Sequence, residues 1–136
     1  MLKERHGFAA LAAAFALGLI LSASQAQAQA FKRTMLQTSP FPPGSPYVTA
    51  LYVVEINAGA KVPPHTHPGL ETLYVLEGEL ALSVEGQPER QLKTGDSAQV
   101  PAGTVHSGAA GSKPVKVLVT YVVEKDKPLS AMVEKK

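Results

Sequence analysis

The chain has 136 residues, of which 45% are hydrophobic and 18% charged, with a formal net charge of +2 and no cysteine. This length is typical of a single domain. The small net charge excludes the basic surface with which proteins bind nucleic acid or an anionic membrane, and the lack of cysteine excludes a disulfide framework.

Residues 1–28 are typical of a secretory signal peptide. Basic residues precede an unbroken apolar run over residues 8–21, and small residues at alternating positions follow it. The run is shorter than the ~20 residues that span a bilayer, which disfavours the alternative of a retained membrane anchor. No cysteine follows, which excludes a bacterial lipid anchor. We expect cleavage after Ala28 or Ala30 and a periplasmic or secreted bacterial protein that is free of the membrane.

Residues 29–46 are predicted to be irregular, because four prolines lie between positions 40 and 46 and proline cannot sit in the middle of a sheet. Within this segment, residues 31–39 alternate enough in polarity to form an edge strand. Such a strand could pair with a neighbouring molecule, since sheet edges must be covered or blunted. This pattern favours a homodimer. At the other end, the charged residues 125–136 are predicted to form a flexible tail.

Residues 47–124 read as short strands separated by glycine and proline. Residues 47–56 are rich in β-branched and aromatic side chains, and residues 71–88 contain two strands joined tightly at Glu77-Gly78. A short strand follows within residues 95–103, and a last strong strand lies within residues 113–125. No helical spacing is seen after the signal region. Many short strands with turn residues at their ends predict an all-β sandwich or barrel.

Strand alternation also predicts which side chains face the interior. In residues 50–56 the inward set includes Tyr52, and in residues 116–124 it includes Tyr121. The favoured interpretation is that both tyrosines are core residues with a hydroxyl at the rim. The alternative is a catalytic role for either one, for instance in steering protons.

The stretch His-Thr-His-Pro-Gly-Leu-Glu places three potential metal ligands close together. His65 and His67 are two residues apart, so in extended backbone their side chains project from the same face. Glu71 opens the next strand, where an inward carboxylate beside an apolar wall is costly unless a cation pairs with it. His106 is a fourth candidate, because Pro101 and the glycine after it form a turn that directs the imidazole toward the barrel.

The distribution of histidine supports a metal site. Of the four histidines, His6 lies in the predicted signal peptide, and the other three all lie in these two stretches. Three imidazoles with one carboxylate suit one divalent transition metal such as Mn, Fe, Co, Ni, Cu or Zn. An octahedral ion would keep two positions open for water, substrate or dioxygen. The alternative is a metal-free site in which these groups only hydrogen-bond one another.

The spacing of these residues resembles the two motifs of the cupin superfamily, as a small single-domain member. The first motif is filled by Gly59, His65, His67, Glu71 and Gly78, and the second by Gly95, Pro101, Gly103 and His106. Ala110 stands where the family usually has asparagine, a departure that concerns the loop and not the ligands. The resemblance implies a small double-sheet β-barrel of the jelly-roll class, a metal held by His65, His67, Glu71 and His106, and a dimer.

The function inferred from the site is broad. A divalent ion with three neutral imidazoles and one carboxylate keeps a single net positive charge, so it should bind a small anionic ligand in the apolar barrel. The first hypothesis is a metal-dependent oxygenase or lyase acting on a small organic acid, enol or phenol. The second is a non-catalytic module that binds or senses a metal or a small metabolite. No clear general base supports catalysis, since Glu77 is expected to be solvated at its turn.

Overall fold

The computed structural model describes residues 29–133. The predicted signal peptide, residues 1–28, lies outside the described residues, as do residues 134–136. The described residues form ten strands and no helix, so they contain no helix that is long and apolar enough to cross a membrane. The strands are β1 (Phe31–Pro40), β2 (Tyr47–Ile56), β3 (Lys61–Thr66), β4 (Leu70–Glu77), β5 (Glu79–Val84), β6 (Arg90–Lys93), β7 (Ser97–Val100), β8 (His106–Ala110), β9 (Val115–Glu124) and β10 (Ala131–Met132).

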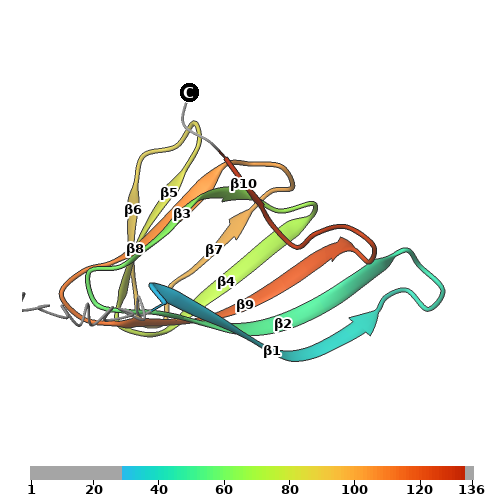
Figure 1. Ribbon diagram of the computed structural model, residues 1–136, viewed down its shortest axis with the longest axis horizontal. Helices are drawn as coiled ribbons and strands as arrows, with labels where there is room; N and C mark the ends of the chain where they lie inside the picture. Colours follow the sequence, from blue (N-terminus) through green and yellow to red (C-terminus); the bar gives the residue numbers. More distant parts are fainter. Residues whose placement is uncertain (1–28, 134–136) are drawn as a thin grey trace, which may run out of the picture.

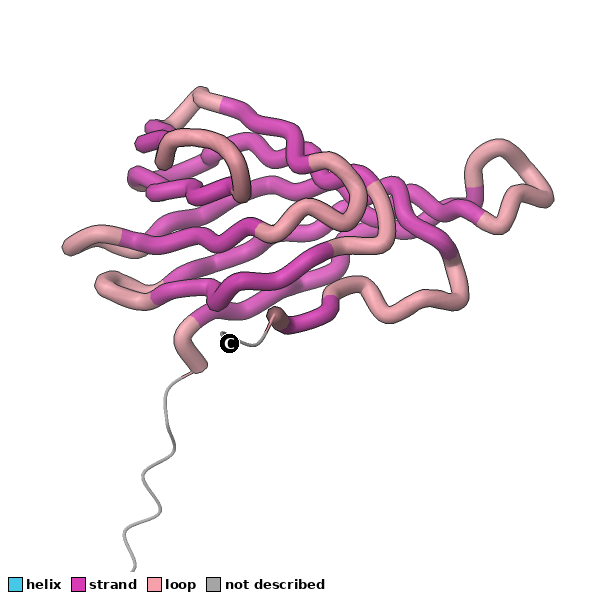
Figure 2. The backbone as a smooth tube through the Cα atoms, turned by 90° about the horizontal axis from the view of Figure 1, so that it is seen from above, coloured by secondary structure: helices cyan, strands magenta, loops and turns pink. Residues whose placement is uncertain are grey.

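The strands form two five-stranded sheets that face each other (Figures 1 and 2). The first sheet has the order β1-β2-β9-β4-β7 and the second has the order β10-β3-β8-β5-β6. All the strand pairs are antiparallel. The predicted all-β, double-sheet β-barrel of the jelly-roll class is therefore confirmed.

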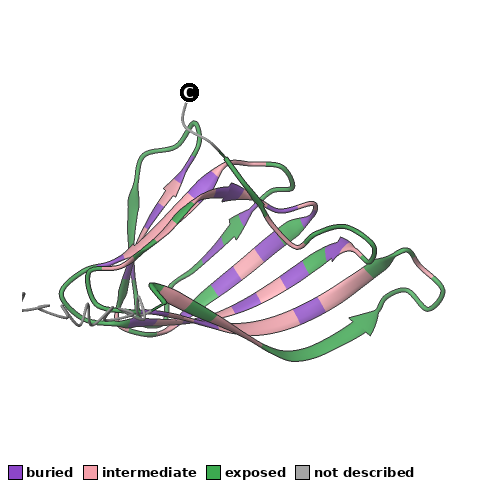
Figure 3. Ribbon diagram, in the orientation of Figure 1, coloured by how far each residue is buried: buried purple, intermediate pink, exposed green. Residues whose placement is uncertain are grey.

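Alternation of burial along the strands explains how these sequences form a barrel. In β9 every second residue from Val115 to Val123 is buried, while the residues between them are only partly covered or exposed (Figure 3). In β2 the buried positions include Ala50, Val54 and Ile56. The predicted inward faces of β2 and β9 are thus confirmed. Because side chains repeat with a period of two, a register shift of one residue would turn every one of them to solvent.

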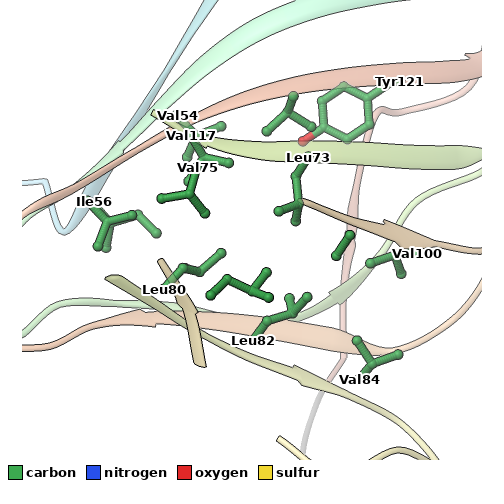
Figure 4. Packing of buried hydrophobic residues seen from close by; sticks show 14 of the residues in the cluster. Val54, Ile56, Leu73, Val75, Leu80, Leu82, Val84, Val100, Val117 and Tyr121 are labelled. Atoms are coloured by element: carbon green, nitrogen blue, oxygen red, sulfur yellow. The ribbon is translucent and has the colours of Figure 1, made fainter. Parts of the chain in front are cut away.

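The core lies between the two sheets (Figure 4). Val75, with no exposed surface, and Leu73 come from β4, and Leu80 and Leu82 come from β5 on the opposite sheet. Full burial of such a side chain contributes about 1.5–3 kcal/mol to folding. This apolar interior holds the two sheets at a fixed spacing. Some of its side chains also line the cavity described below.

Gly78 makes the corner at which the chain leaves the first sheet and enters the second. The tight joint predicted at Glu77-Gly78 is present, but the strands it connects, β4 and β5, belong to different sheets. Gly78 has φ +82°, and a Cβ atom there would lie 2.5 Å from the carbonyl oxygen of Pro114. Only glycine fits this backbone conformation and this close approach.

Both ends of the described chain are more regular than the sequence indicates. Residues 31–40 form an edge strand, as predicted, but it pairs with β2 of the same chain along almost its whole length, with a bulge between Met35 and Gln37. In the segment predicted to be a flexible tail, β10 pairs with β3, and the amide of Val133 donates to the carbonyl of Pro64. Backbone pairing with distant strands gives these segments defined positions.

Candidate metal centre

The four predicted ligands come from both sheets and meet at one place. His65 on β3 lies directly opposite His106, the first residue of β8, in the second sheet. Glu71 on β4 lies opposite Tyr121 of β9 in the first sheet, and His67 lies in the loop that connects the sheets. All four ligands are buried, with exposed fractions of 3–7%. One ligand atom from each lies within 4.8 Å of the others, so the structure brings together every residue of the predicted set.

Each imidazole is oriented by a backbone carbonyl. The Nδ1 atoms of His65, His67 and His106 lie 2.8, 2.6 and 3.0 Å from the carbonyl oxygens of Pro63, Leu129 and Thr104, respectively. A carbonyl oxygen can only accept a hydrogen bond, so each Nδ1 carries the proton. A neutral imidazole then has its lone pair on Nε2, directed toward the centre of the cluster. Such outer partners are the usual way in which proteins fix the tautomer and orientation of a metal-binding histidine.

The remaining contacts at the centre fit a cation. The Nε2 atoms of His67 and His106 each lie 2.9 Å from the same oxygen of Glu71, Oε2. The His106 contact is a hydrogen bond, which requires a second proton on that ring. The His67 contact is short but lacks hydrogen-bond geometry, so this buried Nε2 has no partner. A divalent ion would satisfy the lone pairs of all three Nε2 atoms and the carboxylate together.

The pKa values of the cluster follow from burial and from this hydrogen bonding. Burial raises the pKa of Glu71, but the hydrogen bond with His106 and the close contact with the His67 imidazole outweigh it and lower that pKa to about 2. For His106, burial lowers the pKa, but the hydrogen bond with Glu71 is among the effects that together raise it above 6.5. Burial lowers the pKa of His65 to about 4. The hydrogen bond between His106 and Glu71 thus favours the charged forms of both groups, while burial favours the neutral form of His65.

Gly69 allows the ligand loop to reach its position. A Cβ atom at this residue would lie 1.9 Å from the carbonyl oxygen of Val122 on β9. The loop backbone therefore passes directly against β9 before Glu71 enters β4. The Pro-Gly bend seen in the sequence is thus a site of backbone contact that places the carboxylate opposite its histidine partners.

A cavity of about 50 Å³ lies beside the four ligands, with room for several water molecules. Its wall combines three of the ligands with apolar side chains of both sheets and one cation, Arg33. The lining residues are Phe31, Arg33, Val54, Ile56, Val62, His65, Glu71, Leu73, Leu80, Leu82, His106, Gly108, Val117, Val119 and Tyr121. Arg33 was not predicted as a wall residue, because its position depends on the register in which β1 pairs with β2.

The two tyrosines occupy different positions. Tyr121 lines the cavity, and its ring centroid lies 4.7 Å from that of His67. Burial is the main cause that raises the pKa of its hydroxyl, the negative charge of Glu71 adds to it, and Arg33 opposes it. Tyr52 packs edge-on against Tyr121, at 5.6 Å between centroids, but is not among the residues that line the cavity. Of the two, only Tyr121 is therefore placed to touch a molecule bound there.

Comparison with known proteins agrees with this architecture. A curated relative, the dimethylsulfoniopropionate lyase DddQ of Ruegeria pomeroyi, is 36% identical over 81 residues, which cover 57% of this chain and 40% of DddQ. The crystal structure of DddQ superimposes with a TM-score of 0.59 at 32% identity, covering 62% of this chain and 43% of the DddQ chain. The chain thus spans less than half of the length of this relative.

A similarity of fold alone extends to a double-stranded β-helix protein from Klebsiella pneumoniae, with a TM-score of 0.61 and 23% identity over 77% of this chain and 85% of that one. KdgF from Halomonas sp. is similar at a TM-score of 0.59 and 23% identity, over 71% of this chain and 82% of that chain. Residues 52–121 match the family model described as a cupin domain, which confirms the resemblance inferred from the two motifs. This chain belongs to the cupin family.

Proposed function

We propose that this chain is a metal-dependent cupin enzyme, a lyase, that acts on a small carboxylic acid. The observation that carries the proposal is the cluster of four buried ligands, which converge within 4.8 Å beside an apolar cavity. Of the two reaction types predicted, elimination is favoured over oxygenation because the relative with more than 30% identity is named a lyase. The metal is one of Mn, Fe, Ni, Cu or Zn.

Different residues of the chain would bind the metal ion and exclude water. His65, His67, Glu71 and His106 hold the ion, which supplies Lewis acidity toward an anionic oxygen of the substrate. The apolar side chains of β2, β4 and β9 exclude water, which strengthens every charge interaction in the cavity. The site thus favours a substrate that is small, partly apolar and anionic.

Tyr121 is the candidate catalytic residue in this proposal. Burial raises the pKa of its phenol, which stays protonated at neutral pH, so it would donate a hydrogen bond to a substrate oxygen. A phenol in this state does not serve as a general base without help from a nearby positive charge. Tyr52 would support it through their edge-on contact and would not touch the substrate.

The test is turnover after separate loading with each candidate metal. A panel of small acids that includes dimethylsulfoniopropionate is followed by the appearance of an unsaturated product, with oxygen uptake recorded in parallel. The proposal expects product without oxygen consumption, and loss of product in the Tyr121→Phe variant with metal content unchanged. Oxygen-dependent turnover would favour the oxygenase. Metal and ligand binding without any turnover would favour the alternative of a non-catalytic binding or sensing module.

We also propose that the protein is exported and forms a homodimer. Export is supported by the charged, apolar and small-residue regions of residues 1–28. A mature protein that starts at Gln29 or Phe31, identified by mass spectrometry of the periplasmic or secreted fraction, is the expected result. The dimer is supported by apolar side chains on the outer face of the first sheet, where Leu70, Tyr74 and Val122 are exposed.

A further inference from the structure

Arg33 lies in the wall of the cavity because of the register of β1. It is the direct partner of Val54, a buried residue of β2, and Val54 in turn pairs with Val117 of β9. Residues directly opposite in an antiparallel pair share a face of the sheet, so the side chain of Arg33 points to the inside of the barrel. It lines the same cavity as His65, Glu71 and His106.

The guanidinium of Arg33 has few polar partners in the described protein. It donates one long hydrogen bond of 3.3 Å, from Nη2 to the hydroxyl of Ser130, and it also lies close enough to the hydroxyl of Tyr121 to oppose the rise in the pKa of that phenol. The Cζ atom of Arg33 lies 5.8 Å from the ring centroid of Phe31. No carboxylate of residues 29–133 forms an ion pair with it. A guanidinium has five N–H donors in a planar fork that matches a carboxylate, so Arg33 keeps donors for a ligand beside its contacts with Ser130 and Tyr121.

We infer that Arg33 is a second anion-binding pole of the cavity and that the substrate is a small dianion, such as a short dicarboxylate. One carboxylate of the substrate would bind at the four-ligand cluster, and the other would be held by Arg33. This inference rests on the proposed metal site and names the substrate class for it. A divalent ion and Glu71 together leave one positive charge, and Arg33 adds a second. A substrate with two negative charges neutralises the cavity, whereas a substrate with a cationic group would face a charge of its own sign.

The two anion-binding sites of the cavity, the four-ligand cluster and Arg33, favour short ligands. The cavity is small, so only a few carbon atoms can separate the two carboxylates of a ligand that binds at both sites. Charge-assisted, bidentate contacts between arginine and carboxylate are stronger than neutral hydrogen bonds and are also directional. Arg33 would therefore set both the length and the charge of the preferred ligand, while the apolar walls accept the carbon chain between the two carboxylates.

The test measures ligand binding, so it does not depend on turnover. Protein loaded with Co²⁺ is titrated with oxalate, malonate, succinate, acetate and glycine betaine, and binding is read from the visible spectrum of the cobalt. We expect at least one dicarboxylate to bind about 10- to 100-fold more tightly than acetate, as hydrogen bonds to charged groups allow. Betaine should bind more weakly than acetate. Bound cobalt is measured after each titration, so that removal of the metal by the ligand is recognised.

Variants separate the role of Arg33 from that of the metal. Arg33→Gln should lose the preference for dicarboxylates while it keeps its affinity for acetate and its cobalt content. Arg33→Lys should retain part of the preference, because it keeps the charge but not the fork. Lys32→Gln is the matched control, since Lys32 is exposed on the neighbouring position of β1. Equal binding of acetate and all dicarboxylates by the parent protein, or an unchanged preference in Arg33→Gln, would overturn the inference. If the preference is found but no acid is turned over, the inference stands and the proposed enzyme fails.

Discussion

The Nδ1 atom of His67 donates a hydrogen bond of 2.6 Å to the backbone carbonyl of Leu129, a residue 62 positions later in the chain. The C-terminal segment thus orients a ligand of the candidate metal centre. The same segment is held by the pairing of β10 with β3 and contacts Arg33 through Ser130. A region that resembles a loose tail in the sequence therefore supports both a candidate metal ligand and the cavity wall.

Deletion of residues 129–136 should weaken metal binding about 10- to 100-fold, the usual cost of losing an outer partner of a metal-binding histidine. Affinity is measured by competition with a chromophoric chelator. Deletion of residues 134–136 alone is the matched control, because it leaves every contact described above in place. Parent-like affinity in the longer deletion would show that Leu129 does not orient His67.

Metal should stabilise the fold through the four ligands. At a free metal concentration about a hundredfold above Kd, the expected gain in the free energy of unfolding is ~2.7 kcal/mol. His67→Ala should abolish most of this gain, because the other ligands are left around an empty position. Glu71→Gln keeps the shape but removes the negative charge, so it should weaken metal binding as well.

The control for Glu71→Gln is Glu77→Gln on the same strand, where the carboxylate is exposed and paired with Lys116. This variant should keep the full metal-dependent rise in melting temperature. The metal site would be wrong if His67→Ala bound one equivalent of metal as tightly as the parent, measured by metal content and by thermal shift.

Metal binding should release a proton near neutral pH. The pKa of His106 is raised above its ordinary 6.5 by its hydrogen bond with Glu71, although burial opposes the shift. Protons therefore compete with the ion for this ring at a higher pH than for an ordinary histidine, and the ion must displace a proton bound there. Affinity should fall as pH is lowered, beginning above pH 6.5. Calorimetric titration in buffers with different ionisation enthalpies measures the proton release, and a pH-independent affinity between pH 8 and 5 would contradict this prediction.

Replacement of Gly69 by alanine should destabilise the protein by at least the 1–3 kcal/mol that is typical of overpacking. Its Cβ would lie 1.9 Å from the carbonyl oxygen of Val122, so the ligand loop must move away from β9. Metal affinity should fall in the same variant. Gly111→Ala is the control, because its Cβ would have no neighbour within 4 Å and its backbone has no positive φ. The free energy of unfolding is measured with urea, and equal values for the two variants would contradict the predicted contact.

The proposed dimer should depend on the outer face of the first sheet. Val122→Lys places a charge between the exposed side chains of that face, where burial of an unpaired cation is costly. Light scattering at micromolar concentration should show a dimer for the parent protein and a monomer for the variant. Met132→Lys is the control, since Met132 is exposed on β10 in the other sheet. A monomeric parent protein would remove the basis of the proposal.

Much of the fold and of the metal centre is present in local sequence patterns. Alternation in residues 50–56 and 116–124 predicted the strands and their buried faces, because a strand with one face in the core repeats with a period of two. The spacing of His65, His67, Glu71 and His106 predicted that these four side chains meet, because short turns of proline and glycine leave little freedom in where each side chain points. Within each stretch, these features depend on residues that are close together in the chain.

The tertiary structure decided the features that depend on pairing between strands far apart in the chain. Arg33 faces the cavity only because β1 pairs with β2 in one register, and in the sequence it looks like any other cation of an alternating strand. The carbonyl of Leu129 has no signal in the sequence at all, since every residue has one. Likewise, the tight joint at Gly78 was visible, but its passage between two sheets was not. Register and sheet order are set by contacts between segments far apart in the chain, so local periodicity cannot specify them.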